Sequence, residues 1–532
     1  MPHEPRSDAP LSRSIRRGVS ILALLIVALA PSPGSAQPAS SAPPITERFN
    51  AAAVGGPGAL LHALSQELAG DPSLGATPDS AAALARVAAA PVADFVGANT
   101  PVLRDIARQI IAAAPSDQRS LVEQAVNQAL GTYAELDLSI TPPVRPDTVK
   151  SDSAEPSGVG GTGYKMGSFT LYPDVQAATF YDDNIYATSH NHVSDKIITV
   201  SPRFGLQSDW DRHSLYIEGQ TDVTDYLSHT SENSVDWHIL TEGRIDVSDT
   251  TRILLGGVAL HAHEDRASPD AVEGFQPTPY NELNAYTGIV HRFGDFSYRL
   301  GGSVERITFD NVLGQNGEIN NQDRNRNRYT LGGLLRYEKD PNLQPFIQLQ
   351  ADIRRYDTVL DDFGYNRNSG GFLAGAGTLF IIEPNLSGDV FVGVLSRKYQ
   401  DPVFNAITTP AADATLRWQA KTGTALVLFT ERTIEETTLP GSPGNIYSLG
   451  GLRIEQTLSE RLTGVVRVAY AHSDFVQAGR NDNEIDSSIG LRHRLTEKLT
   501  LGIDYRYTQR LSGNSLYDFT RNQVYVRIGA DF

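Results

Sequence analysis

Five arginines near the end of the chain are spaced so that they fall on successive predicted strands and on the same face. They are Arg453, Arg467, Arg492, Arg506 and Arg527. Neighbouring strands lie about 4.8 Å apart, so these side chains form a row. A guanidinium is always charged and binds carboxylate or phosphate oxygens well. The row therefore either attracts anionic solutes or forms ion pairs with acids on the same face, such as Asp504, Glu455 or Asp531.

Other polar clusters are weaker indications of chemistry. His261, His263, Glu264 and Asp265 suit either a metal ion or the polar rim of a loop, and residues 182–184 (Asp-Asp-Asn) suit either calcium or a turn. The rim and the turn are the favoured interpretations. The sequence contains no Gly-x-Ser-x-Gly elbow, no Gly-Lys-Ser/Thr phosphate loop and no His-Glu-x-x-His motif. We therefore expect no enzymatic activity, no metal and no cofactor.

The C-terminal segment indicates which face the charged residues occupy. Residues 523–532 alternate between polar and apolar side chains and end in Phe532. Because successive side chains of a strand point to opposite faces, one face suits hydrocarbon and the other suits water. This pattern predicts a transmembrane β-barrel strand, and the terminal aromatic residue is typical of the outer-membrane insertion signal.

The same alternation in earlier strands gives further candidates for the polar face. They are Asp352, Arg354, Arg299 and Glu305. An arginine that faces lipid at the midplane costs about 2–4 kcal/mol. All nine charged side chains are therefore predicted to line a wet lumen.

The fold predicted for residues 164–532 is an all-β transmembrane antiparallel barrel of about 18 strands, with 16 as the alternative count. The shortest strand is predicted over 412–420. Connections after even-numbered strands are tight, whereas those after odd-numbered strands are mostly long and polar, with the longest at 264–280. Short periplasmic turns and long outer loops alternate in this way in outer-membrane barrels. A soluble β-sandwich or propeller has no reason to sort its loops so regularly.

The segments before the barrel differ in character. Residues 1–36 combine arginines, a short apolar core and small residues before the cleavage site, which indicates a secretory signal peptide; a membrane anchor is the alternative, but the apolar run is short for a span. Residues 37–56 are rich in Ala, Ser and Pro and are expected to be disordered. Apolar stripes of helical period predict an Ala-rich helical periplasmic region over 57–134. Residues 135–163 are predicted to be a flexible linker.

Composition limits the partners. The chain has no cysteine, which excludes disulfides and thiolate metal sites, and its net charge of −17 argues against nucleic acid. We expect the barrel to contact outer-membrane lipid and lipopolysaccharide, and its C-terminal strand to be read by the barrel-assembly machinery. The helical region is expected to lie in the periplasm of a Gram-negative-type cell, where it either binds a periplasmic export protein or gates the pore.

Residues 180–188 (Phe-Tyr-Asp-Asp-Asn-Ile-Tyr-Ala-Thr), followed by residues 197–202 and a turn that contains Trp210, resemble the opening of the putative beta-barrel porin 2 family. The similarity extends over about 165–532 and leaves out the helical region. The resemblance implies an outer-membrane barrel. Some members of that family are associated with capsule or exopolysaccharide export, and no catalytic residues come with the resemblance.

Three functions remain open from the sequence. The first is an outer-membrane channel that serves as the exit port for exopolysaccharide or capsule. The second is a general diffusion porin for small solutes. The third is a non-conducting surface barrel that acts in adhesion or envelope structure.

Overall fold

The computed structural model describes two parts of the chain, a helical part and a long β part. The described residues are 45, 48, 49, 57–89, 100–115, 118, 122, 126 and 163–532, except for 211, 273, 341, 383, 384, 422 and 497. The predicted signal peptide lies outside them, as do most of the segments 37–56 and 135–163. The last predicted helical stripe, near 121–130, also lies mostly outside them.

Three helices are described in the first part. They are α2 (Pro57–Gly70), α3 (Pro78–Ala89) and α4 (Thr100–Ala113). Their apolar stripes are buried against one another, with Leu60, Leu64 and Ile106 fully buried, as expected of amphipathic helices that share a small core. Among the helices that the structure describes, none has the length and apolar character needed to cross a bilayer.

Eighteen long strands make up the β part. They are β2 (Phe169–Asp182), β3 (Asp195–Ser208), β4 (Ser214–Tyr226), β5 (Ser234–Asp246), β6 (Thr251–His263), β7 (Pro279–Phe293), β8 (Phe296–Phe309), β11 (Arg326–Tyr337), β12 (Leu343–Tyr356), β13 (Ser369–Ile382), β14 (Leu386–Tyr399), β15 (Ile407–Lys421), β16 (Thr424–Glu435), β17 (Asn445–Ser459), β18 (Leu462–Phe475), β19 (Arg480–Arg494), β20 (Leu499–Ser512) and β21 (Phe519–Asp531).

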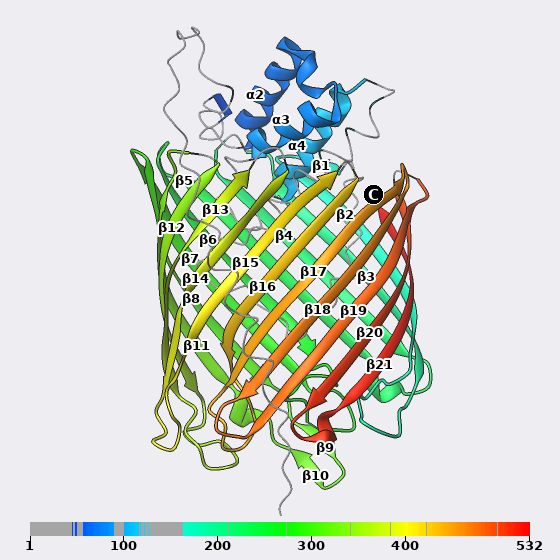
Figure 1. The fold of residues 1–532 in the computed structure, drawn as a ribbon, viewed down its shortest axis with the longest axis vertical. Helices are drawn as coiled ribbons and strands as arrows, with labels where there is room; N and C mark the ends of the chain where they lie inside the picture. The colour runs from blue at the N-terminus through cyan, green and yellow to red at the C-terminus, as the bar shows by residue number, and fades with distance from the viewer. Residues whose placement is uncertain are drawn as a thin grey trace, which may run out of the picture. The chain divides into compact units, whose positions relative to one another are not determined.

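Every long strand pairs antiparallel with its neighbours, and the last strand returns to the first. β2 pairs with β3 on one side and with β21 on the other, where Tyr181 lies opposite Val524. The 19-stranded sheet therefore consists of these strands plus the short β1 (Tyr164–Met166), which pairs with β2. Figure 1 shows the closed wall of tilted strands. The predicted 18-stranded antiparallel barrel is confirmed.

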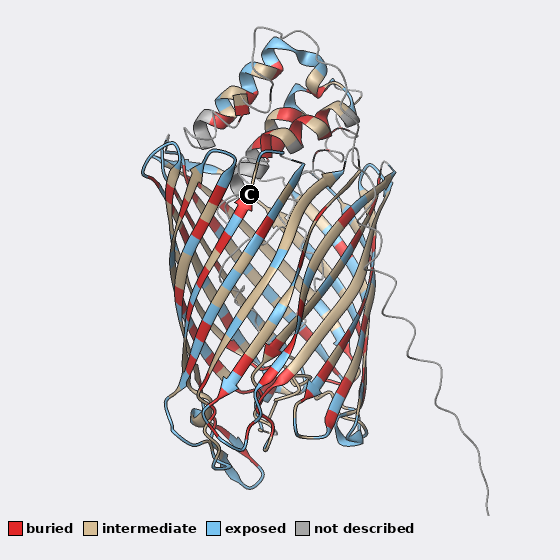
Figure 2. Ribbon diagram, turned by 60° about the vertical axis from the view of Figure 1, so that its left-hand side comes forward, coloured by how far each residue is buried: buried red, intermediate tan, exposed pale blue. Residues whose placement is uncertain are grey.

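The two faces of the wall differ as the alternation predicts. In β21, Val524, Val526 and Ile528 are 43–45% exposed on the outside, whereas Gln523 between β20 and β2 is 4% exposed. Figure 2 shows the resulting alternation of exposed and buried positions along the strands. The apolar face of the barrel points outward and the polar face points inward. An apolar outer surface of this kind is suited to contact with lipid.

Long loops gather at one end of the barrel and short turns at the other (Figure 1). The chain ends at the short-turn end. The loop after β8 contains a small hairpin of β9 (Val312–Gly314) and β10 (Gly317–Ile319).

One strand differs clearly from its predicted bounds. β15 begins at Ile407 rather than at 412, because Pro410 interrupts the alternation that predicts a strand. Residues 407–411 pair with β14, but pairing with β16 begins only at Ala412. A residue that belongs to one ladder only tolerates the missing N–H of proline.

Part of the inner wall is apolar and closely packed. The rings of Phe346 and Phe391 lie parallel, with centroids 6.3 Å apart. Each ring covers a glycine of β13: a Cβ added at Gly377 would lie 2.5 Å from the Phe346 ring, and one at Gly375 would lie 2.5 Å from the Phe391 ring. These glycines leave room for the rings inside the wall.

Gly375→Ala is therefore expected to destabilise the barrel by about 1–3 kcal/mol, the usual cost of overpacking. The added Cβ would also lie 2.3 Å from the carbonyl oxygen of Val392. The urea midpoint of the folded-to-unfolded gel-mobility shift measures the effect. Gly370→Ala on the outer face of the same strand is the control, because its nearest neighbour is 3.8 Å away. Equal midpoints for the two variants would contradict the steric argument.

Candidate functional site

The loop between β6 and β7, residues 264–278, leaves its own wall and crosses the inside of the barrel. The Arg480 guanidinium of β19 donates to the carbonyl oxygen of Pro269 over 3.4 Å, and Arg510 of β20 donates to that of Ala267. Arg521 of β21 lies 3.5 Å from the Asp265 carboxylate. Strands β2–β5 separate β6 from β21 around the sheet. The loop therefore reaches across the lumen to a distant part of the wall.

Two buried ion pairs hold the base of this loop. Glu264 pairs with Arg324, which follows the β9–β10 hairpin. Arg266 forms two bonds of 2.7 and 2.8 Å to Glu232 of the β4–β5 loop and donates to the carbonyl oxygen of Gly274 over 2.9 Å. Both glutamates are 2% exposed. Removing one partner of such a pair leaves a buried charge uncompensated, so breaking either pair is strongly unfavourable.

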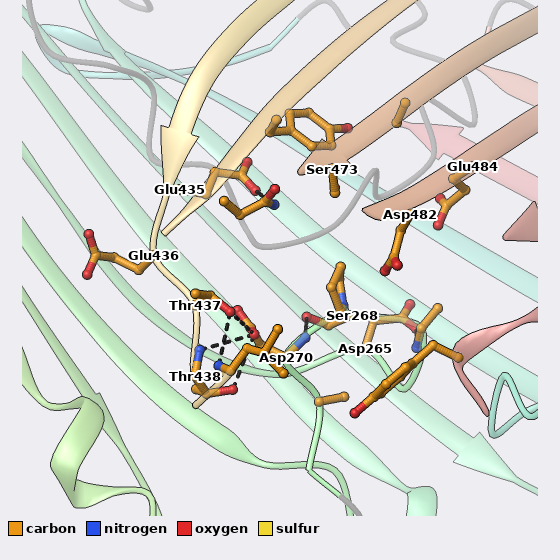
Figure 3. Close-up of a pocket in the computed structure, with 18 of the residues that line it drawn as sticks. Asp265, Ser268, Asp270, Glu435, Glu436, Thr437, Thr438, Ser473, Asp482 and Glu484 are labelled. Carbon is orange, nitrogen blue, oxygen red and sulfur yellow. Dashed lines mark hydrogen bonds between the residues drawn. The ribbon is translucent and has the colours of Figure 1, made fainter. Parts of the chain in front are cut away.

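The tip of the loop meets a second inward loop, residues 436–444 between β16 and β17. The Asp270 carboxylate accepts hydrogen bonds from the Thr437 hydroxyl (2.8 Å) and from the backbone N–H and hydroxyl of Thr438 (3.1 and 3.2 Å). Figure 3 shows this contact, which we call the latch. Since β16 and β17 lie far from β6 and β7 in the strand order, the latch joins loops from different sides of the barrel.

The second loop is itself fixed by one arginine. Arg367, from the β12–β13 loop, donates to the carbonyl oxygens of Thr437 (2.7 Å), Ser442 (3.0 Å) and Leu439 (3.3 Å). Its guanidinium also pairs with Asp361 over 2.6 Å. The position of the latch thus depends on three loops rather than two.

A cavity of about 930 Å³ lies beside the latch and is lined by both loops and by inner faces of β15–β21. Its walls carry twelve carboxylates and eight guanidiniums, a net of four negative charges. The carboxylates belong to Asp265, Asp270, Glu318, Asp323, Asp361, Asp362, Asp413, Glu431, Glu435, Glu436, Asp482 and Glu484, and the guanidiniums to Arg324, Arg326, Arg367, Arg467, Arg480, Arg506, Arg510 and Arg521. A one-signed excess of charge in a low-dielectric wall attracts the opposite ion.

The five arginines do not form one continuous row in the sheet register, and acids accompany them. Arg467 and Arg506 both lie opposite Ser488, whereas Arg492 and Arg527 both lie opposite Gly502, four residues away along the strands. Arg453 lies opposite Arg467 in the register of β17 and β18. Arg453 pairs with Glu455 over 3.1 Å, and Arg467 and Arg506 each pair with Asp486 over 2.6 Å. Arg527 pairs with Asp504, and Arg492 interacts electrostatically with Asp504 and Glu455. The ion-pairing alternative therefore describes these arginines better than a free anionic track does.

Three of the four other candidates for the lumen lie beside residues of opposite charge, and the fourth is buried in the wall. Both oxygens of Asp352 accept from Arg397 at 2.7 Å, and Arg354 pairs with Glu436 of the 436–444 loop. Arg299 is buried on β8, and Glu305 lies opposite Arg328 in the β8–β11 register. At the end of the chain, the Phe532 N–H donates to the carbonyl oxygen of Pro173 over 3.1 Å. The role of Phe532 in insertion stays a prediction.

The side chains of the two polar clusters predicted from the sequence each contact a different partner. His263 lies 2.8 Å from Asp236, and His261 lies 2.9 Å from Asn281. Asn184 donates to the carbonyl oxygens of Thr188 and Thr520, so residues 182–184 form a turn fastened to β21. Within the described residues, no group of three or more His, Cys, Asp or Glu side chains is arranged to hold a metal ion.

The pKa of Asp265 makes the docking of the 264–278 loop sensitive to acid. Burial raises the pKa of this carboxyl, but the Arg521 guanidinium, the Ala267 backbone N–H and the nearby Arg506 and His263 together hold the pKa below its usual range. A depressed folded-state pKa stabilises the docked loop above the unfolded-state pKa, and the contribution is lost as the pH falls through the folded-state value.

A spin label at Ser268→Cys is expected to keep constant mobility from pH 7 to 5 and to become more mobile only below about pH 4, the ordinary aspartate pKa. The chain has no other cysteine, so the label is unique. In Asp265→Asn the acid-induced step should disappear. An onset between pH 5 and 7 would contradict the assignment.

A known protein family matches the part of the chain that forms this barrel. The family described as Putative beta-barrel porin 2 matches residues 156–532. The chain belongs to this family. It is therefore an outer-membrane β-barrel of the porin type, that is, a channel protein, and the expected resemblance is confirmed. No curated protein sequence matches the chain.

Solved structures similar to this porin-family chain are also outer-membrane barrels. OccAB3 of Acinetobacter baumannii is 11% identical, with a TM-score of 0.39. The match covers 68% of this chain and 99% of the OccAB3 chain. OpdK of Pseudomonas aeruginosa is 12% identical, with a TM-score of 0.38 and the same coverage. A second OpdK structure, described with vanillate, has a TM-score of 0.39. Likeness at this level carries no argument about the solute.

The residues that shape the porin interior were not all found from the sequence. Arg467, Arg506 and Arg354 were predicted from the sequence, whereas Asp270, Thr437 and Arg367 were not. These last residues lie in loops without periodicity, and only the closed barrel brings them together. The length of the 264–280 connection was the one available signal, because long loops in compact folds are often functional.

Proposed function

We propose that this porin-family barrel conducts hydrophilic solutes and that the latched loops and the charged cavity beside them select the solutes. The observation that carries the proposal is the contact between Asp270 and the 436–444 loop, which spans the lumen over a wall of charged side chains. A barrel of this strand number leaves an aqueous channel. A loop that crosses such a channel controls what passes through it.

We propose an exopolysaccharide or capsule strand during export as the solute. The same cavity offers carboxylates that accept hydrogen bonds from sugar hydroxyls, and aromatic side chains such as Phe363 and Tyr447 that pack against the apolar face of a sugar ring. The association of some family members with polysaccharide export supports this assignment. A general diffusion porin for small solutes is the second candidate. The latch restricts the lumen to a defined cavity, and a restricted lumen suits small solutes.

Partners of the barrel are proposed on the same basis. The helical region, with its buried stripes on α2, α3 and α4, is proposed to lie in the periplasm and to bind an export protein. The C-terminal strand β21, which ends beside β2 and precedes Phe532, is proposed to be read by the barrel-assembly machinery. Short turns generally mark the periplasmic end of outer-membrane barrels, which supports both proposals.

Deletion of the gene tests the proposed solute. Loss of surface polysaccharide, restored by the intact gene but not by a barrel whose latch is cross-linked through Asp270→Cys and Thr438→Cys, would support export through the lumen. Unchanged polysaccharide together with slower uptake of small solutes would support the diffusion porin instead. Absence of single-channel conductance would favour a non-conducting surface barrel.

A further inference from the structure

Four basic residues project outward from one side of the barrel, all at the long-loop end. They are Arg306 on β8, Arg355 on β12, Lys398 on β14 and Arg432 on β16. Their positions follow from the strand alternation, since each lies two residues from an outward neighbour: Val304, Ile353, Ser396 and Thr430 respectively. No outward position of β8, β11–β15 or β16 in the described structure carries Asp or Glu. The outer wall here is therefore positively charged at one rim only.

Two of these outward residues, Arg306 and Arg355, lie at the same level across three adjacent strands and form the outer row. In the sheet register, Arg306 lies opposite Asn327, and Asn327 lies opposite Arg355. With strands about 4.8 Å apart, the Cα atoms of the two arginines are separated by about 10 Å. The amide of Asn327 stands between them. Such an arrangement offers several N–H donors to one group of oxygen atoms.

One acid offsets the charge of one of these two arginines. The Asp357 carboxylate accepts two bonds of 2.5 Å from Arg306, which orients that guanidinium beside the wall. Arg355 is exposed and donates to the carbonyl oxygen of Arg354 over 3.3 Å. The four basic residues and Asp357 together carry an excess of three positive charges. The Arg432 guanidinium also donates to the hydroxyls of Thr409 (3.1 Å) and Ser448 (2.5 Å).

The outer row lies at the edge of the apolar belt. One step toward the short turns, Val304, Tyr329 and Ile353 lie side by side in the same register and are 45–47% exposed. Side chains of this kind face hydrocarbon, and tyrosine is enriched where hydrocarbon meets headgroups. The basic residues therefore stand at the level of the lipid headgroups.

The other rim of the same strands has different chemistry. There the outward residues are aromatic: the rings of Phe296 and Tyr337 lie 5.0 Å apart, and those of Phe293 and Phe296 lie 5.9 Å apart. A difference between the two rims matches a membrane whose two leaflets differ in headgroup charge. Long loops mark the outer side, so the basic rim faces the outer leaflet.

We propose that the outer face of β8, β11 and β12 at the long-loop end binds the phosphate groups of a phosphorylated glycolipid, the lipid A part of lipopolysaccharide. Arginine binds phosphate oxygens with paired N–H donors. A phosphate monoester carries up to two negative charges, more than the single charge of a phospholipid diester. The proposal does not depend on which solute the lumen carries.

Binding of lipid A to the purified full-length barrel in detergent tests the proposal. The double variant Arg306→Gln/Arg355→Gln is expected to bind bis-phosphorylated lipid A about tenfold more weakly than the unmodified protein, since each basic residue near a charged headgroup contributes measurably. Lys196→Gln is the matched control. Lys196 is exposed at the same end of β3, where the next strand carries the outward Asp225. Its affinity should change less than twofold.

Two further arms separate lipid A from other sources of charge. Lipid A with its phosphates removed should bind the unmodified barrel weakly, and phosphatidylglycerol should not compete at equal concentration. Equal binding by the double variant, by dephosphorylated lipid A or by phosphatidylglycerol would overturn the proposal. Unchanged single-channel conductance of the double variant shows that it has folded. If the double variant does not fold, the proposal is tested by the two experiments on the unmodified barrel, with dephosphorylated lipid A and with phosphatidylglycerol.

Discussion

Asp270→Ala is expected to raise the single-channel conductance about twofold and to make the current fluctuate. The Asp270 carboxylate accepts all three hydrogen bonds of the latch. A hydrogen bond to a charged group contributes about 1.5–3 kcal/mol, so its loss frees the tip of the 264–278 loop from the 436–444 loop. The base of the loop stays held by Glu264 and Arg266, so the barrel itself should remain stable.

Recording in planar bilayers measures this effect, and Asp249→Ala is the matched control. Asp249 is an exposed acid in the tight turn between β5 and β6. It lies at the opposite end of β6 from the 264–278 loop, so its removal should leave the conductance unchanged. A wild-type conductance in Asp270→Ala would mean that the latch does not limit the pore.

Cross-linking the latch supplies the opposite perturbation. Asp270→Cys combined with Thr438→Cys creates the only two thiols in the chain. Oxidation should give a steady conductance no higher than that of the unmodified protein, and reduction should raise it and restore fluctuation. If the oxidised and reduced channels behave alike, the two loops do not move apart during conduction.

The unmodified pore is expected to prefer cations, with a potassium-to-chloride permeability ratio of roughly three at low salt. The cavity carries an excess of four carboxylates, and an excess charge in a confined wall concentrates counter-ions. The preference should weaken at high salt, because the screening length falls from about 10 Å at 0.1 M to about 3 Å at 1 M. Reversal potentials in a salt gradient measure the ratio.

Asp413→Asn, Glu431→Gln and Glu435→Gln together are expected to bring that ratio close to one. Asp413 and Glu431 lie opposite each other on β15 and β16 and line the cavity with Glu435. Neutralising Arg467 raises cation preference under either interpretation of the arginine row, so the acids are the informative targets. A wild-type ratio below one would show that the arginines dominate and would restore the anion-attracting interpretation.

The position of each charged side chain on the wall could be predicted from the sequence, but its partner could not. Alternation puts Arg467 and Asp486 on the same face whatever the register of their strands. Whether they meet within 2.6 Å depends on which residues of β18 and β19 lie opposite each other. That register is set by the pairing of whole strands and by the geometry of the turn between them, and the alternation of single residues does not report either.

The sequence by itself determined a closed barrel with apolar side chains outside and charged side chains inside, because the period-two pattern is local and strands in lipid can pair all their backbone polar groups only in a closed sheet. The strand bounds followed from the same pattern, except where Pro410 broke it. Only the tertiary structure decided how the lumen is divided. Asp270, Thr438 and Arg367 are distant in the chain and sit in loops without periodicity, and closure of the sheet alone brings them within hydrogen-bonding distance.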